Sequence, residues 1–264
     1  MAVVAIVGPT ASGKSAVAMR LADQLGGEVV SVDSMQVYRG LDIGTAKPTA
    51  ADRHRVPHHL IDVADPEDTF TVAEFQQLGM TALQEIGERS AVPLVVGGSG
   101  LHFRALVDPL EFPPSDAAVR AEIEAMDPAD SVLALLAADP QAATVVDLAN
   151  PRRVARALEV FRLTRATPTV RAHSDSAAAV REYRPRVPMV AIGLDAGERL
   201  ADRAEARFDA MLDAGLLDEV EAFQDRLGVT AAQGVGYKEL LPVVRRELPL
   251  DQARAAAINA TMGL

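Results

Sequence analysis

The chain has 264 residues, 49% of them hydrophobic, so it can bury a large core as one domain with an insertion or as two domains. The absence of cysteine excludes disulfides, cysteine-ligated zinc and thiol catalysis. No run approaches the roughly 20 apolar residues of a membrane span and no export signal is recognised, so we expect a cytoplasmic protein with no membrane partner. The formal net charge of −11 argues on its own against a nucleic-acid partner.

The first expected element is a strand over residues 2–7, and the segment GPTASGKS follows it directly. The spacing of its glycines, lysine and serine fits the P-loop, in which backbone N–H groups at a helix N-terminus surround phosphate oxygens. Lys14 would add a positive charge there, and the hydroxyl of Ser15 would bind a metal ion, Mg²⁺. The expected phosphate-binding residues are Gly8, Pro9, Thr10, Ala11, Ser12, Gly13, Lys14 and Ser15.

Short β-type runs alternate with amphipathic stretches along the chain, which predicts an α/β fold with a parallel sheet. One helix is expected over residues 14–25, where two glycines end it. Another is expected over residues 71–89, because Thr71 and Glu74 have the spacing of a capping box. The expected strands are residues 2–7, 28–32, 94–96 and 189–194.

A carboxylate follows the second strand, in the segment SVDSMQVY at residues 31–38. Asp33 would lie at the carboxyl end of that strand beside the P-loop strand, where ligand sites occur in open α/β sheets. It could serve as a metal ligand, a substrate anchor or a general base, or simply cap a turn.

The next strand ends in glycines and carries no carboxylate, in the segment PLVVGGSG at residues 93–100. Many P-loop ATPases place an Asp that holds Mg²⁺ at this point, so its absence argues against an ATP-hydrolysing motor or switch. Gly97, Gly98 and Ser99 instead allow a close approach of substrate to the backbone, which is compatible with a tight strand-to-helix turn.

Strand character fades between residues 111 and 186, which predicts a helical insertion. Residues 150–186 contain nine arginines and three acids, a local balance of +6. This predicts either a polyanion-binding patch or a soluble surface. Residues 198–263 are expected to be helical, with breaks near Gly228 and Pro249.

Three histidines, His54, His58 and His59, lie close together in the sequence. No suitably spaced carboxylate completes a metal-ligand set, so we interpret the segment PHHLID as a loop-to-strand packing element.

Six sequence blocks occur in order: GPTASGKS, SVDSMQVYRGLDIGTAKP, PHHLID, VGGSGLHFRAL, NPRRVARALEV and QGVGYKEL. In this order they resemble the bacterial tRNA dimethylallyltransferases, the tRNA isopentenyltransferase or IPP transferase family, over nearly the whole chain. The resemblance implies that the P-loop holds the diphosphate of dimethylallyl diphosphate. It further implies transfer of the prenyl group to N6 of adenosine 37 in tRNAs that read codons starting with U.

The expected chemistry requires a base and cations. The exocyclic amine of adenine is a poor nucleophile because its lone pair is delocalised, so a carboxylate that accepts its proton lowers the barrier. Asp33 matches the general base of the family. Lys14, Mg²⁺ on Ser15 and an arginine of the segment ADRAEARFDAML would stabilise the leaving diphosphate. Arg203 and Arg207 lie four residues apart in this segment, and we expect Arg203 to take that role.

The resemblance also implies that tRNA is a partner, bound through its anticodon stem-loop. Adenosine 37 lies in a single-stranded loop, where a base can be splayed out into a pocket. We expect the protein to act on it as a monomer. The residues that match tRNA contacts of the family are Asp33, Ser34, Met35, Gln36, Ser99, Arg120, Arg152, Arg153, Val154, Ala155, Arg156, Gln233, Gly234, Val235, Gly236, Tyr237 and Lys238.

Together these features predict a P-loop NTPase-like parallel sheet flanked by helices, with an all-helical insertion. The catalytic core would comprise residues 1–111 and 187–264, and the tRNA-binding insertion residues 112–186. The family pattern continues beyond residue 264 into a basic segment. We therefore expect a chain that stops there to bind tRNA more weakly than a longer form.

Three other functions fit parts of the sequence. A P-loop kinase for a nucleotide or another small molecule shares the phosphate loop and a helical insertion. A dimethylallyltransferase for free adenine nucleotides shares the donor chemistry. A non-enzymatic RNA-binding module would share the arginines but does not need Asp33 beside the P-loop.

Overall fold

The computed structural model describes residues 2–263, so positions 1 and 264 of the expected domain ranges lie outside the described residues. The chain forms two compact units. Residues up to Val107 and residues from Val187 onward make the first unit, and Asp108–Arg186 make the second. The second unit therefore begins at Asp108 rather than at residue 112.

The first unit is built on a parallel sheet of five strands, in the order β3-β2-β4-β1-β5. This confirms the predicted fold class. All carboxyl ends meet at one edge of the sheet, where P-loop proteins bind ligands. The strands are β1 (Val3–Val7), β2 (Gly27–Ser31), β3 (His58–His59), β4 (Val92–Gly97) and β5 (Met189–Gly193). The sequence does not reveal β3, because two residues are too few to show an alternating pattern.

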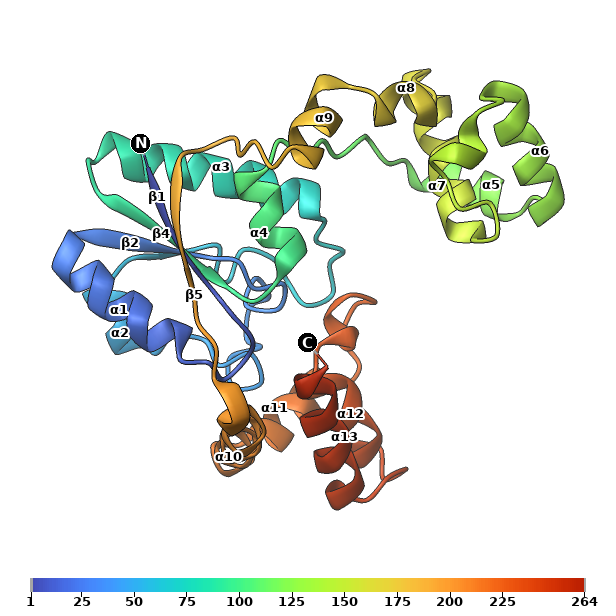
Figure 1. Ribbon diagram of the computed structural model, residues 1–264. Helices are drawn as coiled ribbons and strands as arrows, with labels where there is room; N and C mark the ends of the chain where they lie inside the picture. Colours follow the sequence, from blue (N-terminus) through green and yellow to red (C-terminus); the bar gives the residue numbers. More distant parts are fainter. Residues whose placement is uncertain (1, 264) are drawn as a thin grey trace. The chain divides into compact units, whose positions relative to one another are not determined.

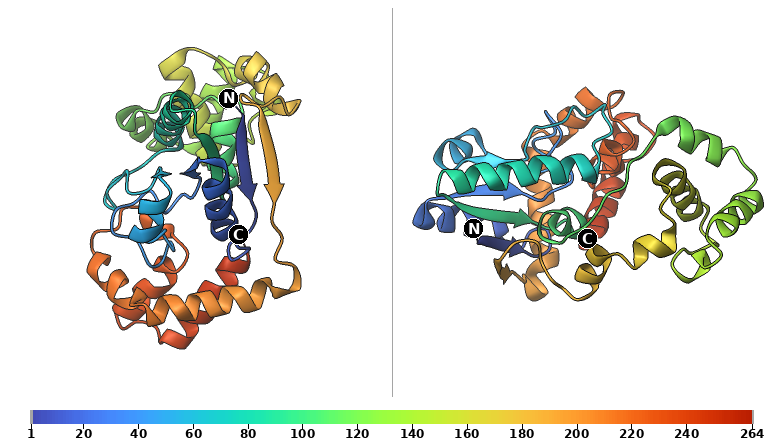
Figure 2. Two further views of the ribbon diagram at one scale, coloured as in Figure 1. Left: turned by 90° about the vertical axis from the view of Figure 1, so that its left-hand side faces the viewer. Right: turned by 90° about the horizontal axis from the view of Figure 1, so that it is seen from above.

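Helices cover both faces of this sheet (Figures 1 and 2). Helix α1 lies on one face, where Met19 packs with Ile6, Val29 and Leu94 of three strands. Helix α3 lies on the opposite face beside α4. The helices of this part of the chain are α1 (Lys14–Leu25), α2 (Ala50–Arg55), α3 (Val72–Glu88) and α4 (Gly100–Val107).

The two sequence signals for helix ends appear in the structure. Gly26 ends α1 with a φ of +61°, and its N–H bonds to the carbonyl of Ala22. Thr71 caps α3, and its hydroxyl accepts the N–H of Glu74 while the Glu74 carboxylate accepts the N–H of Thr71. Both signals are local, so they do not depend on the rest of the fold.

After β5 the chain is helical to its described end, as expected from the sequence. The helices pack on one another at the carboxyl edge of the sheet, with α13 against α10 and α12 (Figure 1). They are α10 (Leu200–Asp213), α11 (Leu216–Phe223), α12 (Tyr237–Val244) and α13 (Leu250–Met262), with short 3₁₀ helices at Gly197–Arg199 and Ala231–Gln233.

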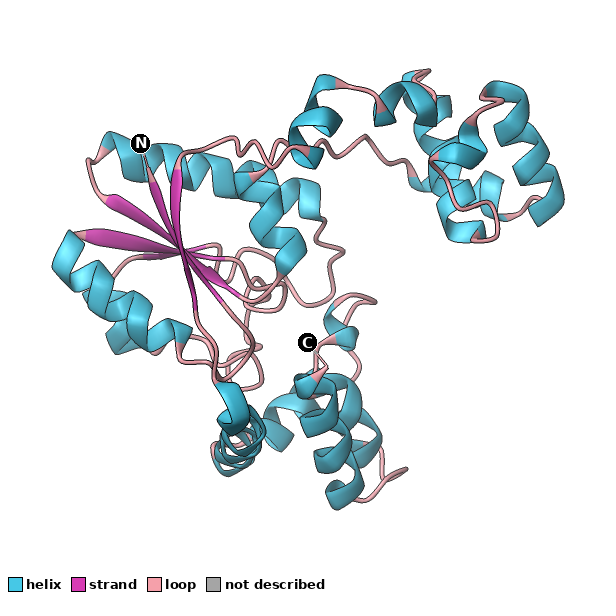
Figure 3. Cartoon of the chain, in the orientation of Figure 1, coloured by secondary structure: helices cyan, strands magenta, loops and turns pink. Residues whose placement is uncertain are grey.

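The second unit contains helices and loops alone among its described residues (Figure 3). Its core joins Ile123, Leu135 and Leu158 from three helices. Its helices are α5 (Ala117–Glu124), α6 (Pro128–Ala138), α7 (Pro151–Thr164), α8 (Pro168–Ala172) and α9 (Asp175–Arg181), with a 3₁₀ turn at Ala142–Thr144. No helix within residues 2–263 is both long and apolar enough to cross a membrane.

Candidate active site

The P-loop connects β1 to α1 and is shaped by its backbone. Gly13 caps α1 with a φ of +93°, a conformation that side chains disfavour. The Lys14 ammonium crosses the loop and donates to the carbonyl of Pro9 at 2.6 Å. The hydroxyl of Ser12 is buried and has no hydrogen-bond partner among the described residues. The turn leads into the N-terminus of α1, and the Lys14 ammonium lies across it, so the loop suits an anionic group.

Asp33 follows β2 and is held by its own loop. Its Oδ1 accepts the backbone N–H groups of Met35 at 2.8 Å and Gln36 at 3.3 Å. These bonds form an Asx turn, which fixes the direction of the carboxylate. Oδ2 has no hydrogen-bond partner among residues 2–263, so it is available to accept a proton from a ligand.

The end of β4 lies directly against the P-loop. A β-carbon on Gly98 would lie 3.2 Å from the carbonyl oxygen of Gly8 and 3.8 Å from Nζ of Lys14. A β-carbon on Gly97 would lie 2.5 Å from the carbonyl oxygen of Val32. Both glycines therefore keep the backbones close together, and neither brings a carboxylate to the phosphate loop.

The structure distinguishes the two candidate arginines of α10. Arg207 is partly buried and has no hydrogen bond or ion pair to another described residue, whereas Arg203 is exposed. Burial lowers the pKa of Arg207, and the negative charge of Asp33 opposes this shift. Burial also lowers the pKa of Lys14, with a further contribution from Arg207 and opposition from Asp33. The charges of Lys14, Arg207 and Asp33 therefore interact. The single negative charge of Asp33 does not balance the two positive charges.

These groups surround one cavity of about 1040 Å³ in the first unit. Its volume is at the upper end of ligand pockets, so it has room for more than a diphosphate. Gly8, Ser12, Tyr237 and Lys238 do not line it. The expected site residues that do line it are residues 9–11, 13–15, 33–36, Ser99, Arg203, Arg207 and 233–236.

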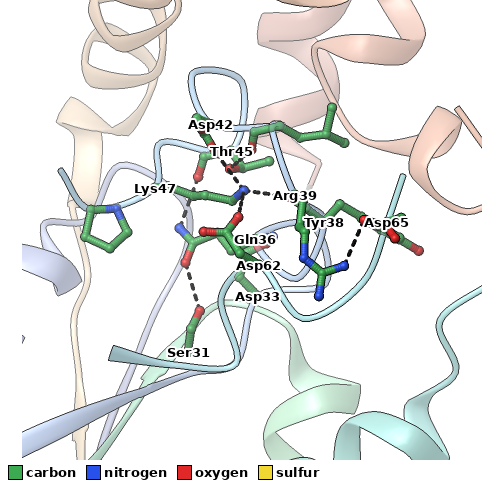
Figure 4. A network of polar contacts seen from close by, with 12 residues as sticks. Ser31, Asp33, Gln36, Tyr38, Arg39, Asp42, Thr45, Lys47, Asp62 and Asp65 are labelled. Atoms are coloured by element: carbon green, nitrogen blue, oxygen red, sulfur yellow. Dashed lines mark hydrogen bonds and ion pairs between the residues drawn. The ribbon is translucent and has the colours of Figure 1, made fainter. Parts of the chain in front are cut away.

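A polar network fixes the loop between β2 and α2 beside the cavity (Figure 4). Gln36 accepts from the hydroxyl of Ser31 at 2.8 Å and donates to the carbonyl of Thr45 at 3.1 Å. Lys47 is almost fully buried and donates to Asp42 at 2.7 Å and to Asp62 at 2.6 Å. Because the Gln36 side chain is used within the loop, it supports the position of Asp33. The burial of Lys47 has no signal in the sequence, since an isolated lysine carries no local pattern that indicates it.

Hydrogen bonds from Lys47 and Arg53 lower the pKa of Asp62, although burial alone would raise it. Asp62 therefore stays ionised and balances the buried ammonium.

Glu219 of α11 joins the C-terminal helices to the same loop. Its carboxylate accepts the backbone N–H groups of Asp42, Ile43 and Gly44 at 2.8 to 3.0 Å. It also accepts the hydroxyl of Tyr237 at 2.5 Å. Tyr237 is fully buried, and burial raises its pKa, as does its bond to Glu219. Tyr237 thus supports the loop and does not reach the cavity. Nothing in the sequence signals this role of Glu219, because the loop N–H groups that it accepts lie about 175 residues away.

Ser99 and His102 form a pair at the start of α4, and no pattern in the sequence indicates it. The Ser99 hydroxyl lies 2.8 Å from Nδ1 of His102, and the imidazole packs edge-on against Phe75. Burial lowers the pKa of His102, while Asp33 opposes the shift. Ser99 lines the cavity, whereas His102 does not, and the contact with His102 holds the Ser99 hydroxyl in position.

The expected arginines of the helical unit differ in their surroundings. Arg120 and Arg156 both bond to the fully buried Glu159, at 3.0 and 2.6 Å. Arg152 and Arg153 are exposed. Val154 is fully buried and Ala155 is partly buried, so the side chain of Val154 packs in the core of the unit.

The histidines do not form a metal centre. No group of three His, Asp or Glu side chains that could hold a metal ion occurs within residues 2–263. His59 instead lies 2.6 Å from the buried carboxylate of Glu28, which also pairs with Arg89 at 2.9 Å. His58 lies beside the carbonyl of Val56.

The fold and this site define a P-loop protein of the parallel α/β class, in which the phosphate loop faces a carboxylate and a partly buried arginine. The model of the IPP transferase family matches residues 36–264 of the chain. The chain therefore belongs to the IPP transferase family.

Individual relatives agree with this assignment. A tRNA dimethylallyltransferase of Acidothermus cellulolyticus is 45% identical over 268 residues, covering 98% of this chain and 82% of the relative. One of Streptomyces griseus is 43% identical over 267 residues, covering 98% and 83%.

Solved structures give the same family. The full-length tRNA isopentenylpyrophosphate transferase of Bacillus halodurans is 37% identical, with a TM-score of 0.67 over 98% of this chain and 82% of that one. A eukaryotic dimethylallyltransferase, solved acting on tRNA, is 27% identical, with a TM-score of 0.78 over 98% of this chain and 66% of that one.

Proposed function

We propose that this chain is a tRNA dimethylallyltransferase, acting as a monomer in the cytoplasm. It transfers the dimethylallyl group of dimethylallyl diphosphate to N6 of adenosine 37, in tRNAs that read codons starting with U. The observation that carries the proposal is that the P-loop and Asp33, whose Oδ2 is free, line one cavity, while the end of β4 has no acidic residue. This arrangement suits a leaving diphosphate and an attacking amine better than a transferred phosphoryl group.

The donor diphosphate would lie in the P-loop, residues 8–15. Its oxygens would accept the loop N–H groups, and they would draw the Lys14 ammonium away from the carbonyl of Pro9. Both Arg203 and Arg207 line the cavity, but Arg207 is the partly buried one and has no partner among the described residues, so it would supply the second cation. Two cations at the diphosphate stabilise the negative charge that develops as the C–O bond breaks.

Ser15 would bind Mg²⁺ together with diphosphate oxygens. Its place in the P-loop, at the first turn of α1 and in the lining of the cavity, fits this role. Bound Mg²⁺ would neutralise charge on the leaving group. The donor set of the protein is a single hydroxyl, so the substrate oxygens would complete the coordination.

Asp33 would act as the general base. The N6 nitrogen attacks the allylic carbon, a C–N bond forms, the C–O bond breaks, and diphosphate leaves with the electron pair. The proton of N6 passes to Oδ2 of Asp33, while Oδ1 remains bonded to the backbone of Met35 and Gln36. The Asx turn thus keeps the base in place during the reaction.

Recognition of tRNA would use both units. In the first unit, Ser34, Met35 and Ser99 line the cavity with residues 233–236 and would receive the splayed adenosine. The exposed Lys238, close in the chain to residues 233–236, would contact phosphates of the RNA. In the helical unit, the exposed Arg152 and Arg153 would contact phosphates of the anticodon stem-loop directly. Arg120, Val154, Ala155 and Arg156 would contribute mainly by holding that surface together.

The competing functions make separate predictions. A small-molecule kinase would transfer a phosphoryl group from ATP, and a free-nucleotide prenyltransferase would modify AMP. Labelled dimethylallyl diphosphate and labelled ATP are therefore each offered with an anticodon stem-loop or with AMP. We expect label in the stem-loop from the prenyl donor alone. Transfer from ATP alone would establish a kinase, and prenylation of AMP alone would remove tRNA from the proposal.

We expect Arg207→Gln to weaken binding of dimethylallyl diphosphate by about 10- to 100-fold, because it removes a charge-assisted bond to the diphosphate. Arg203→Gln, one helical turn away on the same helix, is the matched control, and we expect a change of less than about threefold, because this side chain is exposed. Calorimetric titration of both variants with the donor measures the difference. A larger loss of donor affinity in the Arg203 variant would show that Arg203, and not Arg207, binds the diphosphate.

A further inference from the structure

One exposed tyrosine stands apart from the other aromatic side chains. The chain has seven Phe, three Tyr and no Trp. Tyr38 and Tyr237 are fully buried, whereas the side chain of Tyr183 is 90% exposed. It is the one Phe or Tyr side chain classed as exposed within residues 2–263. An exposed aromatic ring gains nothing from the core, so packing does not account for it.

The backbone conformation at Tyr183 also indicates that packing and stability do not explain the tyrosine. Tyr183 has a φ of +53°, in the left-handed region. It follows the cap of α9 in a Schellman motif, in which its N–H bonds to the carbonyl of Val180 and the N–H of Arg184 bonds to that of Ala179. Glycine is favoured at this position because it has no β-carbon. The chain therefore carries a bulky side chain where glycine would be more stable, which points to a role for the ring itself.

The surroundings of the ring are positively charged. The segment REYRPR, residues 181–186, holds three arginines and one acid. Arg181 and Arg186 donate to backbone carbonyls of Ala172 and Leu110, and neither forms an ion pair with a described carboxylate. Only Arg184 has an acidic partner, Glu182, in a pair that is exposed on both sides. An exposed ring flanked by uncompensated guanidinium groups is the arrangement by which proteins bind single-stranded nucleic acid.

We propose that Tyr183 is a stacking platform for an unpaired base of the RNA substrate, with the flanking arginines at the adjacent phosphates. The inference rests on the proposed action on tRNA, whose anticodon loop offers unpaired bases. The other expected RNA contacts of the helical unit are four arginines together with Val154 and Ala155. A stacked Tyr183 would add a contact to a base. Stacking does not read sequence, because every base has a π-face, so Tyr183 would contribute affinity and position.

The test uses Tyr183→Gly in the full chain, because this change removes the ring and also relieves the backbone. We expect the melting temperature to stay the same or rise, while the dissociation constant for an anticodon stem-loop increases about five- to hundredfold. Tyr183→Phe keeps the ring and should bind the stem-loop within about twofold of the unchanged protein. Leu133→Ala removes another exposed side chain of the same unit, 64% exposed on α6, and should leave binding unchanged.

Two further readouts separate stacking from charge. The slope of log Kd against log salt should be the same in Tyr183→Gly, because no phosphate contact is removed. Binding to heparin, a polyanion without bases, should also be unchanged. Equal stem-loop affinity of Tyr183→Gly and the unchanged protein would overturn the inference, and so would an equal loss on heparin.

The proposed function is tested separately in the same samples. If the unchanged protein prenylates the stem-loop but Tyr183→Gly binds it equally well, stacking fails and the function stands. If the unchanged protein transfers no prenyl group, yet Tyr183→Gly binds the stem-loop more weakly, the function fails and the stacking platform stands.

Discussion

Asp33→Asn should lower kcat for dimethylallyl transfer by about 10²- to 10⁴-fold, the range expected when a general base is removed. The substitution is well matched to the structure. Asparagine keeps an Oδ1 that can accept the N–H groups of Met35 and Gln36, so the Asx turn is preserved. It replaces the free Oδ2 with an amide nitrogen that cannot accept a proton. The loss should therefore fall on the chemical step.

The measurement is single-turnover transfer to a stem-loop, together with calorimetric binding of dimethylallyl diphosphate to the same protein. We expect donor affinity within a few-fold of the unchanged protein. Asp65→Asn is the control, because Asp65 is an exposed carboxylate of the same unit that pairs with Arg39 and does not line the cavity. If donor affinity falls as far as the rate does, Asp33 holds the donor or its metal ion and is not primarily the base.

Glu159→Gln should destabilise the helical unit by about 3 kcal/mol, because it leaves a buried charge network without its anion. Both oxygens of Glu159 are used, one by the hydroxyl of Ser115 and the N–H of Asp116, the other by Arg120 and Arg156. The side chain is fully buried. Urea unfolding followed by circular dichroism, with hydrogen exchange of the amides in α5 and α7 to localise the loss, measures the effect.

The same carboxylate predicts how stability depends on pH. Burial alone would raise the pKa of Glu159, but hydrogen bonds from two guanidinium groups, a hydroxyl and a backbone N–H lower it from 4.5 to about 2. The folded pKa is depressed, so the stabilisation is fully present above about pH 4.5 and is lost as the pH falls toward 2. In Glu159→Gln this part of the acid dependence should disappear.

Glu122→Gln is the matched control for both experiments. Glu122 pairs with Arg162 at 3.2 Å in the same unit, but its side chain is 71% exposed. We expect a change below about 0.5 kcal/mol and the same acid dependence as the unchanged protein. Equal stability of Glu159→Gln and Glu122→Gln would show that the buried network does not hold the unit together. Arg120 and Arg156 would then be available to the RNA.

The turn expected at residues 8–15 and the two expected helix ends occur in the structure, because they depend on neighbouring residues. The P-loop needs eight consecutive residues and a left-handed Gly13, and the cap of α3 needs only Thr71 and Glu74. The order of β-type and helical runs also sufficed for the fold class, since parallel strands joined by helices allow few topologies. Strand β3 could not be predicted in this way, because its two residues pair with β2 but show no sequence pattern of their own.

The sequence by itself determined the fold class, the family and the turn between β1 and α1, because each depends on local conformation or on blocks of residues in order. Only the tertiary structure decided which arginine of α10 is partly buried at the cavity, that Glu159 engages two expected RNA contacts, and that Glu219 holds the loop at residues 42–44. These depend on contacts between residues far apart in the chain. Local sequence patterns do not encode which distant residues come into contact or how deeply they are buried. These contacts are determined by the packing of the whole fold.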